Sequence, residues 1–191
     1  MKFSPILLDV PEQFESERLE MRAVLAGDGA VHYAAVQESM TDLRRYLGHL
    51  PWVKEAPSLA VSEKYCRIQR STFIQRDNLV FFIYLKTDQS MVGSVGLHRI
   101  DWNIPRFEIG YWCRSGAQGN GYIVEAVNAI TGMAFAKLAA RRIEIRADDV
   151  NRPSWKVAEK AGFDLEGILR KSEKDELTGE LRDLRIYAKT V

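Results

Sequence analysis

Two glycines shortly before an expected helix could form an anion-binding loop. Gly119 and Gly121 lie in the stretch QGNGYI (118–123), and a run with helical spacing follows directly. Without side chains there, successive backbone N–H groups can point into one concavity, next to the positive end of the helix dipole. Such a pocket suits phosphate oxygens. An ordinary turn between a strand and a helix would show the same two glycines, so the loop alone leaves both interpretations open.

Two common phosphate-binding motifs do not fit this loop. A P-loop would have Lys and then Ser or Thr after its last glycine, where this chain has Tyr122 and Ile123. A dinucleotide-binding fingerprint would place a third glycine at position 124, which is Val124. The loop therefore favours neither a nucleotide-dependent nor a dinucleotide-dependent enzyme.

An acidic residue stands in the middle of an expected strand. In RFEIGYW (106–112), Glu108 alternates with Phe107 and Ile109 and so faces the opposite side of the strand. A carboxylate at that place is unusual unless the face lines a cleft. Glu108 is therefore a candidate for acid–base chemistry.

The hydrophobic pattern predicts the elements that would position these residues. Helical spacing covers 27–50 (as one or two helices), 59–77, 123–138 and 151–162, and 51–58 is expected to be a loop. Strand patterns cover 18–24, 79–87, 91–100, 106–114, 141–147, 163–171 and 181–191. Helices come first, then three meandering strands, and then strands alternating with helices. This order predicts an α/β fold of the mixed, α+β kind around a largely antiparallel sheet.

Size and charge narrow the possible functions. The 191 residues, 46% of them hydrophobic and 28% charged, suit a single domain spanning 1–191. Lys and Arg number 27 against 26 Asp and Glu, so no global field would hold nucleic acid or an anionic membrane, and neither is an expected partner. No apolar run reaches the length of a membrane span, and the first residues do not resemble a signal peptide. We expect a cytoplasmic protein.

The cysteines and histidines indicate no metal chemistry. Cys66 and Cys113 are far apart, and the chain has no C-x-x-C pair. The three histidines are scattered along the sequence. We expect two reduced thiols, with no disulfide framework and no metal site.

Several motifs, in this order, resemble those of the GNAT superfamily of acetyl-CoA-dependent N-acetyltransferases. They are ESERLEMR near the start, EIGYW, the Gln-x-x-Gly loop with the EA of the next helix, N-x-x-S, EKAGF-x-x-EG and the terminal RDLRIYA. The closest resemblance is to the RimJ/RimL-like branch, which acetylates the N-termini of ribosomal proteins. It covers most of the chain. It implies the GNAT fold, with a mostly antiparallel seven-stranded sheet flanked by helices, and acetyl-CoA as co-substrate without a metal.

The resemblance implies that the cofactor binds to two backbone segments and to one helix-capping residue. Backbone N–H groups of the loop would hold the diphosphate of coenzyme A; its residues are Gln118, Gly119, Asn120, Gly121, Tyr122, Ile123 and Val124. The family usually has Gly or Ala at the place of Ile123, although the ribosomal-protein branch tolerates a larger side chain. Pantetheine would pair with the backbone near Trp112, Cys113 and Arg114, where that strand splays from the next. Asn151 would cap a helix and also bond the cofactor.

Acetyl transfer to an amine needs a base for the amine and an acid for the leaving thiolate. Two bases stay open: Glu108, whose F-x-E-I context is similar to that of histone-acetylating relatives, and Glu173, which matches the base assigned in the ribosomal-protein branch more loosely. Many relatives use as acid a Tyr at the place of Ala158, so the resemblance points to Ser154 instead. Cys113 is expected to be a small buried hydrophobe and not a covalent acetyl carrier.

The acceptor is expected to approach from the other face of the sheet, across residues 41–58. Basic and aromatic side chains there could form a rim that attracts an acidic segment of a ribosomal protein, or simply a solvated helix face; they are Arg44, Arg45, Tyr46, Trp52 and Lys54. We therefore expect acetylation of a protein N-terminal α-amine. A small-molecule amine, such as a polyamine or aminoglycoside, and a non-catalytic acyl-CoA sensor remain alternatives. The resemblance makes a homodimer plausible.

Overall fold

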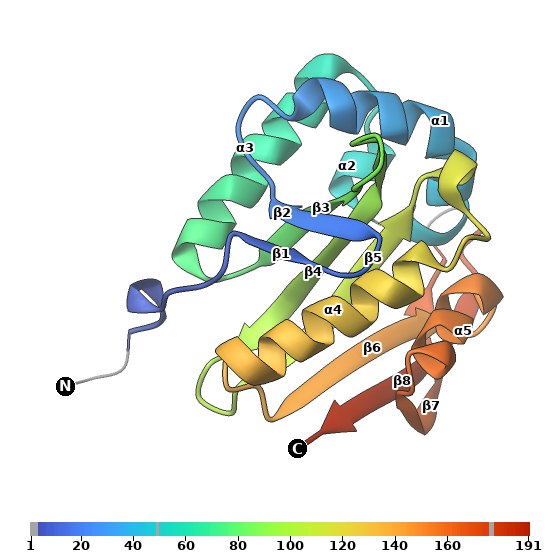
Figure 1. The fold of residues 1–191 in the computed structure, drawn as a ribbon. Coiled ribbons are helices and arrows are strands. Elements are labelled where there is room, and N and C mark those ends of the chain that lie inside the picture. The colour runs from blue at the N-terminus through green and yellow to red at the C-terminus, as the bar shows by residue number, and fades with distance from the viewer. Residues whose placement is uncertain (1–3, 49, 176–177) are drawn as a thin grey trace.

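One eight-stranded sheet organises the chain, and helices cover both of its faces (Figure 1). The computed structural model describes residues 4–48, 50–175 and 178–191. The strands are β1 Gln13–Glu15, β2 Leu19–Ala23, β3 Leu79–Leu85, β4 Met91–Asp101, β5 Arg106–Cys113, β6 Arg142–Asp148, β7 Asp164–Lys174 and β8 Leu181–Thr190. Their order across the sheet is β1-β2-β3-β4-β5-β6-β8-β7. Within the described strands only β5 and β6 run parallel, which confirms the prediction of a mixed, mostly antiparallel fold.

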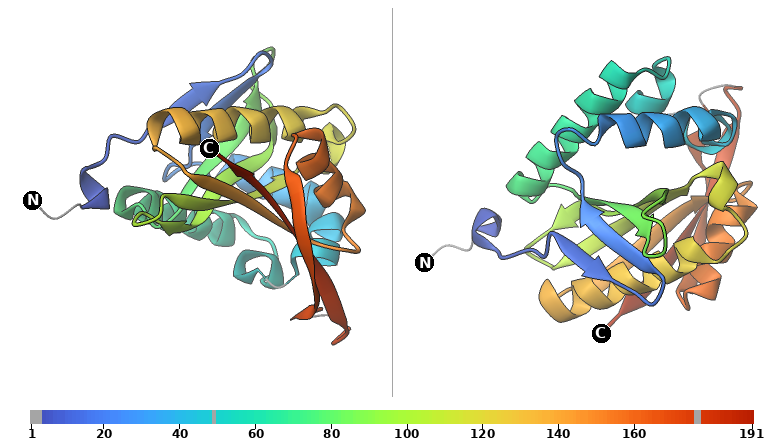
Figure 2. Two further views of the ribbon diagram at one scale, coloured as in Figure 1. Left: turned by 90° about the horizontal axis from the view of Figure 1, so that it is seen from below. Right: turned by 45° about the horizontal axis from the view of Figure 1, so that its top comes forward.

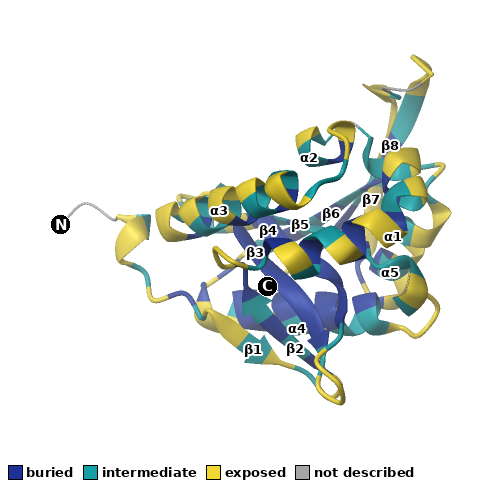
Figure 3. Cartoon of the chain, turned by 90° about the horizontal axis from the view of Figure 1, so that it is seen from above, coloured by how far each residue is buried: buried dark blue, intermediate teal, exposed yellow. Residues whose placement is uncertain are grey.

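The helices divide between the two faces of the sheet (Figure 2). They are α1 Gly29–Leu47, α2 Pro51–Lys54, α3 Leu59–Gln75, α4 Tyr122–Lys137 and α5 Arg152–Lys160. Helices α1 to α3 cover one face and α4 and α5 the other. The central strands between these layers are mostly coloured as buried (Figure 3). In the described part of the chain, no helix has the length and apolar character needed to cross a membrane.

Two apolar cores follow from the alternation within the central strands. Phe107 and Ile109 of β5 pack on the side of α4, where Val127 and Ile130 are fully buried. Trp112 of the same strand belongs to the second core, beneath α1 and α3. Because neighbouring residues of a strand point to opposite faces, β5 contributes to both cores.

Local signals start the helices where the sequence predicts. Ser58 caps α3 by accepting a hydrogen bond from Val61 N at 3.2 Å, and Asn151 caps α5 by accepting one from Ser154 N at 3.2 Å. Gly121 precedes α4 in the left-handed region, with φ of 77°. The predicted cap at Asn151 is therefore confirmed.

Three elements differ from the predictions. The sheet has eight strands and not seven, because β1, which has Phe14 as its only apolar residue, pairs with β2 although it is too short to show a period. The expected loop at 51–58 begins with the four-residue helix α2, which has Pro51 in its first turn. Strand β7 continues to Lys174, so Glu173 lies in a strand opposite Arg182 and not in a loop, because pairing resumes after a bulge.

Strands β5 and β6 separate soon after they meet. Their register joins Arg106–Glu108 to Arg142–Glu144 and ends there. Strand β5 continues along β4 as far as Cys113, and β6 continues along β8 as far as Asp148. The sheet is therefore open between β5 and β6 beyond Glu108.

Candidate active site

A cleft of about 1580 Å³ passes along this opening. Helices α1 to α3 contribute to its wall, together with β5, the glycine loop, α5 and the β7–β8 hairpin. The predicted site residues that line it are Glu108, Trp112, Cys113, Gln118, Gly119, Gly121, Tyr122, Ile123, Val124, Asn151, Ser154 and Glu173. Arg114 and Asn120 are not among the lining residues. The fold thus gathers most of the predicted site around one cavity.

The glycine loop leaves backbone donors without partners. Gly119 and Gly121 have φ of 81° and 77°, the region that favours glycine. Gly121 has no side chain to cap α4, and the first hydrogen bond of the helix runs from Glu125 N to Gly121 O at 3.1 Å. Within the described chain, the N–H groups of residues 122–124 therefore have no acceptor. Donors of this kind suit a diphosphate.

The large side chain at Ile123 does not obstruct this loop. Ile123 is 8% exposed and belongs to the core beneath α4, together with Val127 and Ile130. Its side chain therefore serves helix packing, while its N–H group belongs to the open first turn.

Acidic side chains of α1 hold the loop from one side. Arg114 pairs with Glu38 at 2.6 Å, and Gly116 N donates to the same carboxylate at 2.7 Å. Asp42 accepts from Ser115 Oγ at 2.9 Å and from Gln118 Nε2 at 3.0 Å. Helix α1 therefore fixes the conformation of the loop.

Arg18 holds the loop from the other side. Its Nε donates to Glu125 at 2.7 Å, and its Nη1 donates to the carbonyl of Asn120 at 3.2 Å. Its guanidinium lies 4.7 Å from the ring centre of Tyr122, a cation–π contact. The side chain of Asn120 donates within the loop, to the carbonyls of Ala117 and Gln118. Asn120 thus has a structural place outside the cleft.

The backbone along the opening differs from the expectation at Arg114. Arg114 N donates to Val92 O at 2.7 Å, so its amide is already used by β4. Because successive residues of an antiparallel ladder alternate, Trp112 also directs its N–H and C=O toward β4. Tyr111 and Cys113 direct theirs toward the opening, and these two residues are the better placed for an extended ligand there.

Glu108 lies on the face of β5 that carries Trp112, with 22% of its side chain exposed. Burial raises the pKa of the Glu108 carboxyl, and the charges of Arg99 and Arg146 oppose that rise. The Nε atoms of these arginines lie 3.5 and 3.7 Å from Glu108 Oε2. A bulge after His98 accompanies this contact, because Arg99 there has φ of 46°. A carboxylate with a raised pKa at a cleft is suited to proton transfer.

Glu173 lies farther out along the same cleft. It is an exposed residue of β7, and its charge contributes to the raised pKa of Glu108. Both carboxylates that the sequence offered as base therefore line one cavity.

Ser154 lies in the first turn of α5, on the opposite face of the sheet from Glu108. Its Oγ lies 3.2 Å from the hydroxyl oxygen of Tyr111, and that hydroxyl donates to Ser154 O at 2.9 Å. Ala158 is fully buried one turn later. Cys113 has a pKa raised to about 11 by burial, so its thiol stays protonated and is a weak nucleophile.

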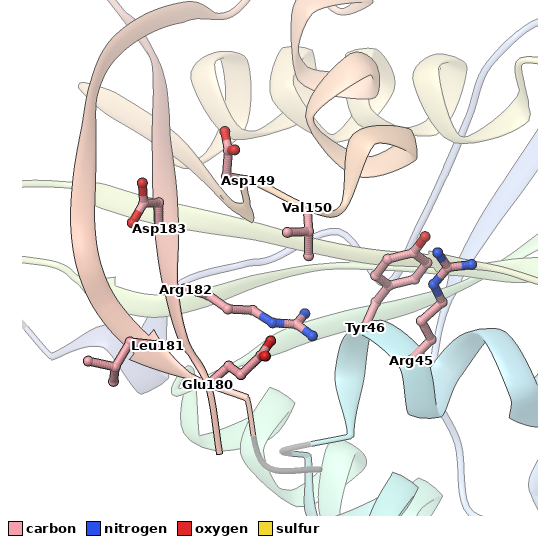
Figure 4. Close-up of a pocket in the computed structure, with 8 residues that line it drawn as sticks. All are labelled: Arg45, Tyr46, Asp149, Val150, Glu180, Leu181, Arg182 and Asp183. Carbon is pink, nitrogen blue, oxygen red and sulfur yellow. The ribbon is translucent and has the colours of Figure 1, made fainter. Parts of the chain in front are cut away.

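A second depression of about 480 Å³ adjoins the cleft (Figure 4). Arg45 and Tyr46 at the end of α1 lie on one side of it, and Glu180 and Arg182 of the hairpin region on the other. Arg45, Tyr46 and Arg182 also line the main cleft. Of the expected rim, Arg44, Arg45, Tyr46 and Trp52 line the cleft, and Lys54 does not. No group of three His, Cys, Asp or Glu side chains that could hold a metal occurs among the described residues.

Comparison with known proteins decides the family. Residues 18–164 match the acetyltransferase (GNAT) domain. The chain belongs to the GNAT family of acetyltransferases. It is 30% identical to the ribosomal-protein-serine acetyltransferase of Escherichia coli (strain K12), over 92% of this chain and 94% of that protein. It is 33% identical to the uncharacterized N-acetyltransferase p20 of Bacillus licheniformis, over 56% of this chain but only 60% of that relative's length.

Solved structures show the same fold for this acetyltransferase. The microcin C7 self-immunity acetyltransferase MccE, in complex with acetyl-CoA and AMP, has a TM-score of 0.85 and 22% identity, covering 95% of this chain and 98% of that one. RimL, a ribosomal L7/L12 alpha-N-protein acetyltransferase in complex with coenzyme A, has a TM-score of 0.83 and 22% identity, covering 95% and 97%. The expected GNAT fold and acetyltransferase class are confirmed.

Several residues that line the cleft of this GNAT enzyme were not predicted from the sequence. Tyr111 was visible as part of EIGYW, and strand alternation could have placed it on the face opposite Glu108. Arg99, Arg146 and Asp42 gave no local signal, because their partners lie on other elements.

Proposed function

We propose that this acetyltransferase moves an acetyl group from acetyl-CoA to the N-terminal α-amine of a protein, with a ribosomal protein as the first candidate. The observation that carries the proposal is the opening between β5 and β6, because it connects the two faces of the sheet. Helix α4, whose first turn follows the glycine loop, and Ser154 of α5 lie on one face, and Glu108 lies on the other, with Trp112. A donor and an acceptor could therefore meet inside the sheet.

The residues present fit coenzyme A. The N–H groups of residues 122–124 would hold its diphosphate, and Tyr111 and Cys113 offer backbone groups to the amides of its arm. Lys156 and Lys160 of α5 also line the cleft and could pair with phosphate. Asn151 uses its side-chain oxygen for the cap, which leaves its amide N–H groups for the cofactor.

Acetyl-CoA, when bound, supplies the acetyl group as a thioester. Glu108 would accept a proton from the attacking amine, whose nitrogen forms the new bond to the acetyl carbon. Ser154 would give its hydroxyl proton to the sulfur as the carbon–sulfur bond breaks, and would regain a proton from solvent. Glu173 is the second candidate for the base, since it lines the same cleft.

The acceptor class rests on the shape and charge of the cleft and on one relative. The cleft continues into the outer depression between α1 and the hairpin, which gives an extended segment a path. Apart from Lys156 and Lys160, seven Lys or Arg stand against six Asp or Glu among the described lining residues, so the cleft lacks the excess of acidic side chains that would favour a polycationic amine. A relative with 30% identity over most of the chain is a ribosomal-protein-serine acetyltransferase.

An acceptor panel tests this proposal. Purified protein with acetyl-CoA would be offered peptides with free N-termini, acidic and basic, the same peptides with blocked N-termini, and small amines. We expect a mass gain of one acetyl group on free N-termini only, with acidic peptides preferred. If only spermidine or an aminoglycoside is acetylated, the acceptor is a small-molecule amine and not a protein N-terminus. If acetyl-CoA binds but no acceptor is acetylated, the protein is better described as a non-catalytic acyl-CoA sensor.

A further inference from the structure

The hydroxyl of Tyr111 contacts Ser154 at two atoms. It donates to Ser154 O at 2.9 Å and lies 3.2 Å from Ser154 Oγ. The two residues are 43 positions apart and come from β5 and α5. Within the described chain, Tyr111 is the hydrogen-bonding partner of the Ser154 hydroxyl.

The surroundings keep this phenol neutral. Burial raises the pKa of Tyr111 well above its usual value, so its hydroxyl retains a proton throughout the range in which enzymes work. A neutral phenol can accept a hydrogen bond at its oxygen or donate one with its proton. Tyr111 also lines the cleft beside Ser154.

As Ser154 gives up its proton, its Oγ atom needs a hydrogen-bond donor, and a neutral phenol can supply one. An aliphatic hydroxyl is a weak acid, and negative charge develops on Ser154 Oγ while its proton moves to the leaving sulfur. A hydrogen bond to an ionised oxygen is roughly twice as strong as one between neutral groups. Ala158, fully buried one turn along α5, has no hydroxyl to offer.

We propose that Tyr111 is a positioning residue for this acetyl transfer: its hydroxyl turns from Ser154 O to donate to Ser154 Oγ as Ser154 protonates the sulfur. The inference rests on the proposed role of Ser154. The carbon–sulfur bond breaks with its electron pair on sulfur, sulfur takes the Ser154 proton, and Ser154 regains one from solvent. Tyr111 keeps its own proton throughout, and its hydroxyl acts on Ser154 and on neither substrate.

A double-mutant cycle tests this role. Tyr111→Phe should lower kcat about tenfold, equal to about 1.4 kcal/mol, while calorimetry shows an acetyl-CoA Kd within about twofold of wild type. In a Ser154→Ala background the same change should have almost no effect on kcat, because the oxygen it supports is gone. Tyr84→Phe is the matched control: it removes a buried phenol hydroxyl that accepts a hydrogen bond from Arg22 at 3.0 Å, outside the cleft lining, and should leave kcat unchanged.

A second substitution keeps the test independent of folding. Tyr111→3-fluorotyrosine retains the hydroxyl and makes it a stronger donor, so kcat should equal or exceed that of wild type. Three results would overturn the inference. Tyr111→Phe could lower kcat equally in the wild-type and Ser154→Ala backgrounds, or it could lower only the affinity for acetyl-CoA. The third such result is a fluorotyrosine enzyme whose kcat is as low as that of Tyr111→Phe.

The cycle also separates this inference from the proposed function. If only a small amine is acetylated, the cycle is run with that amine, and only the acceptor class is wrong. If Ser154→Ala retains full kcat, the role of Ser154 is wrong, and the role of Tyr111 is wrong with it. If Ser154→Ala is slow and Tyr111→Phe is not, this inference alone is overturned.

Discussion

Glu108 of β5 lies opposite Glu144 of β6, and this is the last residue pair that joins the two strands. Beyond it, each strand follows another neighbour, β4 or β8. The proposed base therefore stands where the sheet begins to open. An amine arriving from one face could reach the opening beside this carboxylate.

Glu108→Gln should remove the acidic limb of the pH–rate profile. Burial raises the pKa of Glu108, and a base works only when deprotonated, so kcat/KM of the wild type should rise with pH through that raised pKa. The variant should be about 100-fold slower at neutral pH and lack this limb. Glu173→Gln is the comparison, and the opposite pattern in the two variants would transfer the role to Glu173.

Ser154→Ala should slow the chemical step without weakening cofactor binding. The variant loses the hydroxyl but keeps the N–H that Asn151 caps, so α5 should remain intact. We expect kcat to fall about 100-fold with the acetyl-CoA Kd nearly unchanged, as measured by steady-state kinetics and calorimetry. Ser172→Ala, which removes an exposed hydroxyl of β7 that bonds Leu169 O, should match wild type. Parallel loss of affinity and rate would argue against an acid role.

Gly121→Val should weaken the binding of acetyl-CoA more than it slows the chemical step. With φ of 77°, position 121 would strain a β-branched residue by about 1–3 kcal/mol, and the loop would relax away from its anion-binding form. The acetyl-CoA affinity should fall about tenfold or more. Gly132→Ala, inside α4 with open space around the new methyl group, should bind normally. Unchanged affinity for Gly121→Val would contradict the phosphate assignment.

Asp42→Ala should loosen the same loop from a distance. It removes the acceptor for Ser115 Oγ and Gln118 Nε2, each bond worth about 1 kcal/mol. Because these bonds fix the loop from α1, we expect acetyl-CoA to bind roughly fivefold more weakly, while far-UV circular dichroism stays that of wild type. Asp88→Ala, in the turn between β3 and β4, serves as the control. If Asp42→Ala and Asp88→Ala bind acetyl-CoA with equal affinity, the hydrogen bonds from Asp42 to the loop are not needed for cofactor binding.

His32 should make the fold sensitive to mild acid. It is 1% exposed and stacked between Tyr65 and Phe82, both of its ring nitrogens lack a hydrogen-bond partner among the described residues, and burial lowers its pKa to about 4. The unfolded chain binds this proton below about pH 6.5. Stability should therefore fall as pH drops from about 6.5 to 4, by up to about 3 kcal/mol from this group.

Denaturant midpoints measured across that range would show the effect. His32→Leu removes the titrating ring, so its stability should depend less on pH than that of wild type. If the two slopes are the same, His32 does not carry the dependence.

The sequence by itself determined the features that depend on near neighbours along the chain. Alternation placed Phe107 and Ile109 in one core and Glu108 on the opposite face, and two glycines marked the loop before α4. Asn151 predicted the start of α5, because a capping side chain bonds a backbone N–H group only three residues away. Such signals have periods of two to four residues, which a reader of the sequence can see.

Only the tertiary structure decided which distant residues meet. Tyr111 and Ser154 are 43 positions apart, and Gln118 and Asp42 are 76 apart, so their contacts depend on strand order and helix docking. The end of pairing at Glu108 likewise depends on how β6 binds β8, which no pattern within β5 records. Strand register and packing depend on the whole chain, because the most stable pairing of strands is the one that buries the most apolar surface in the complete sheet.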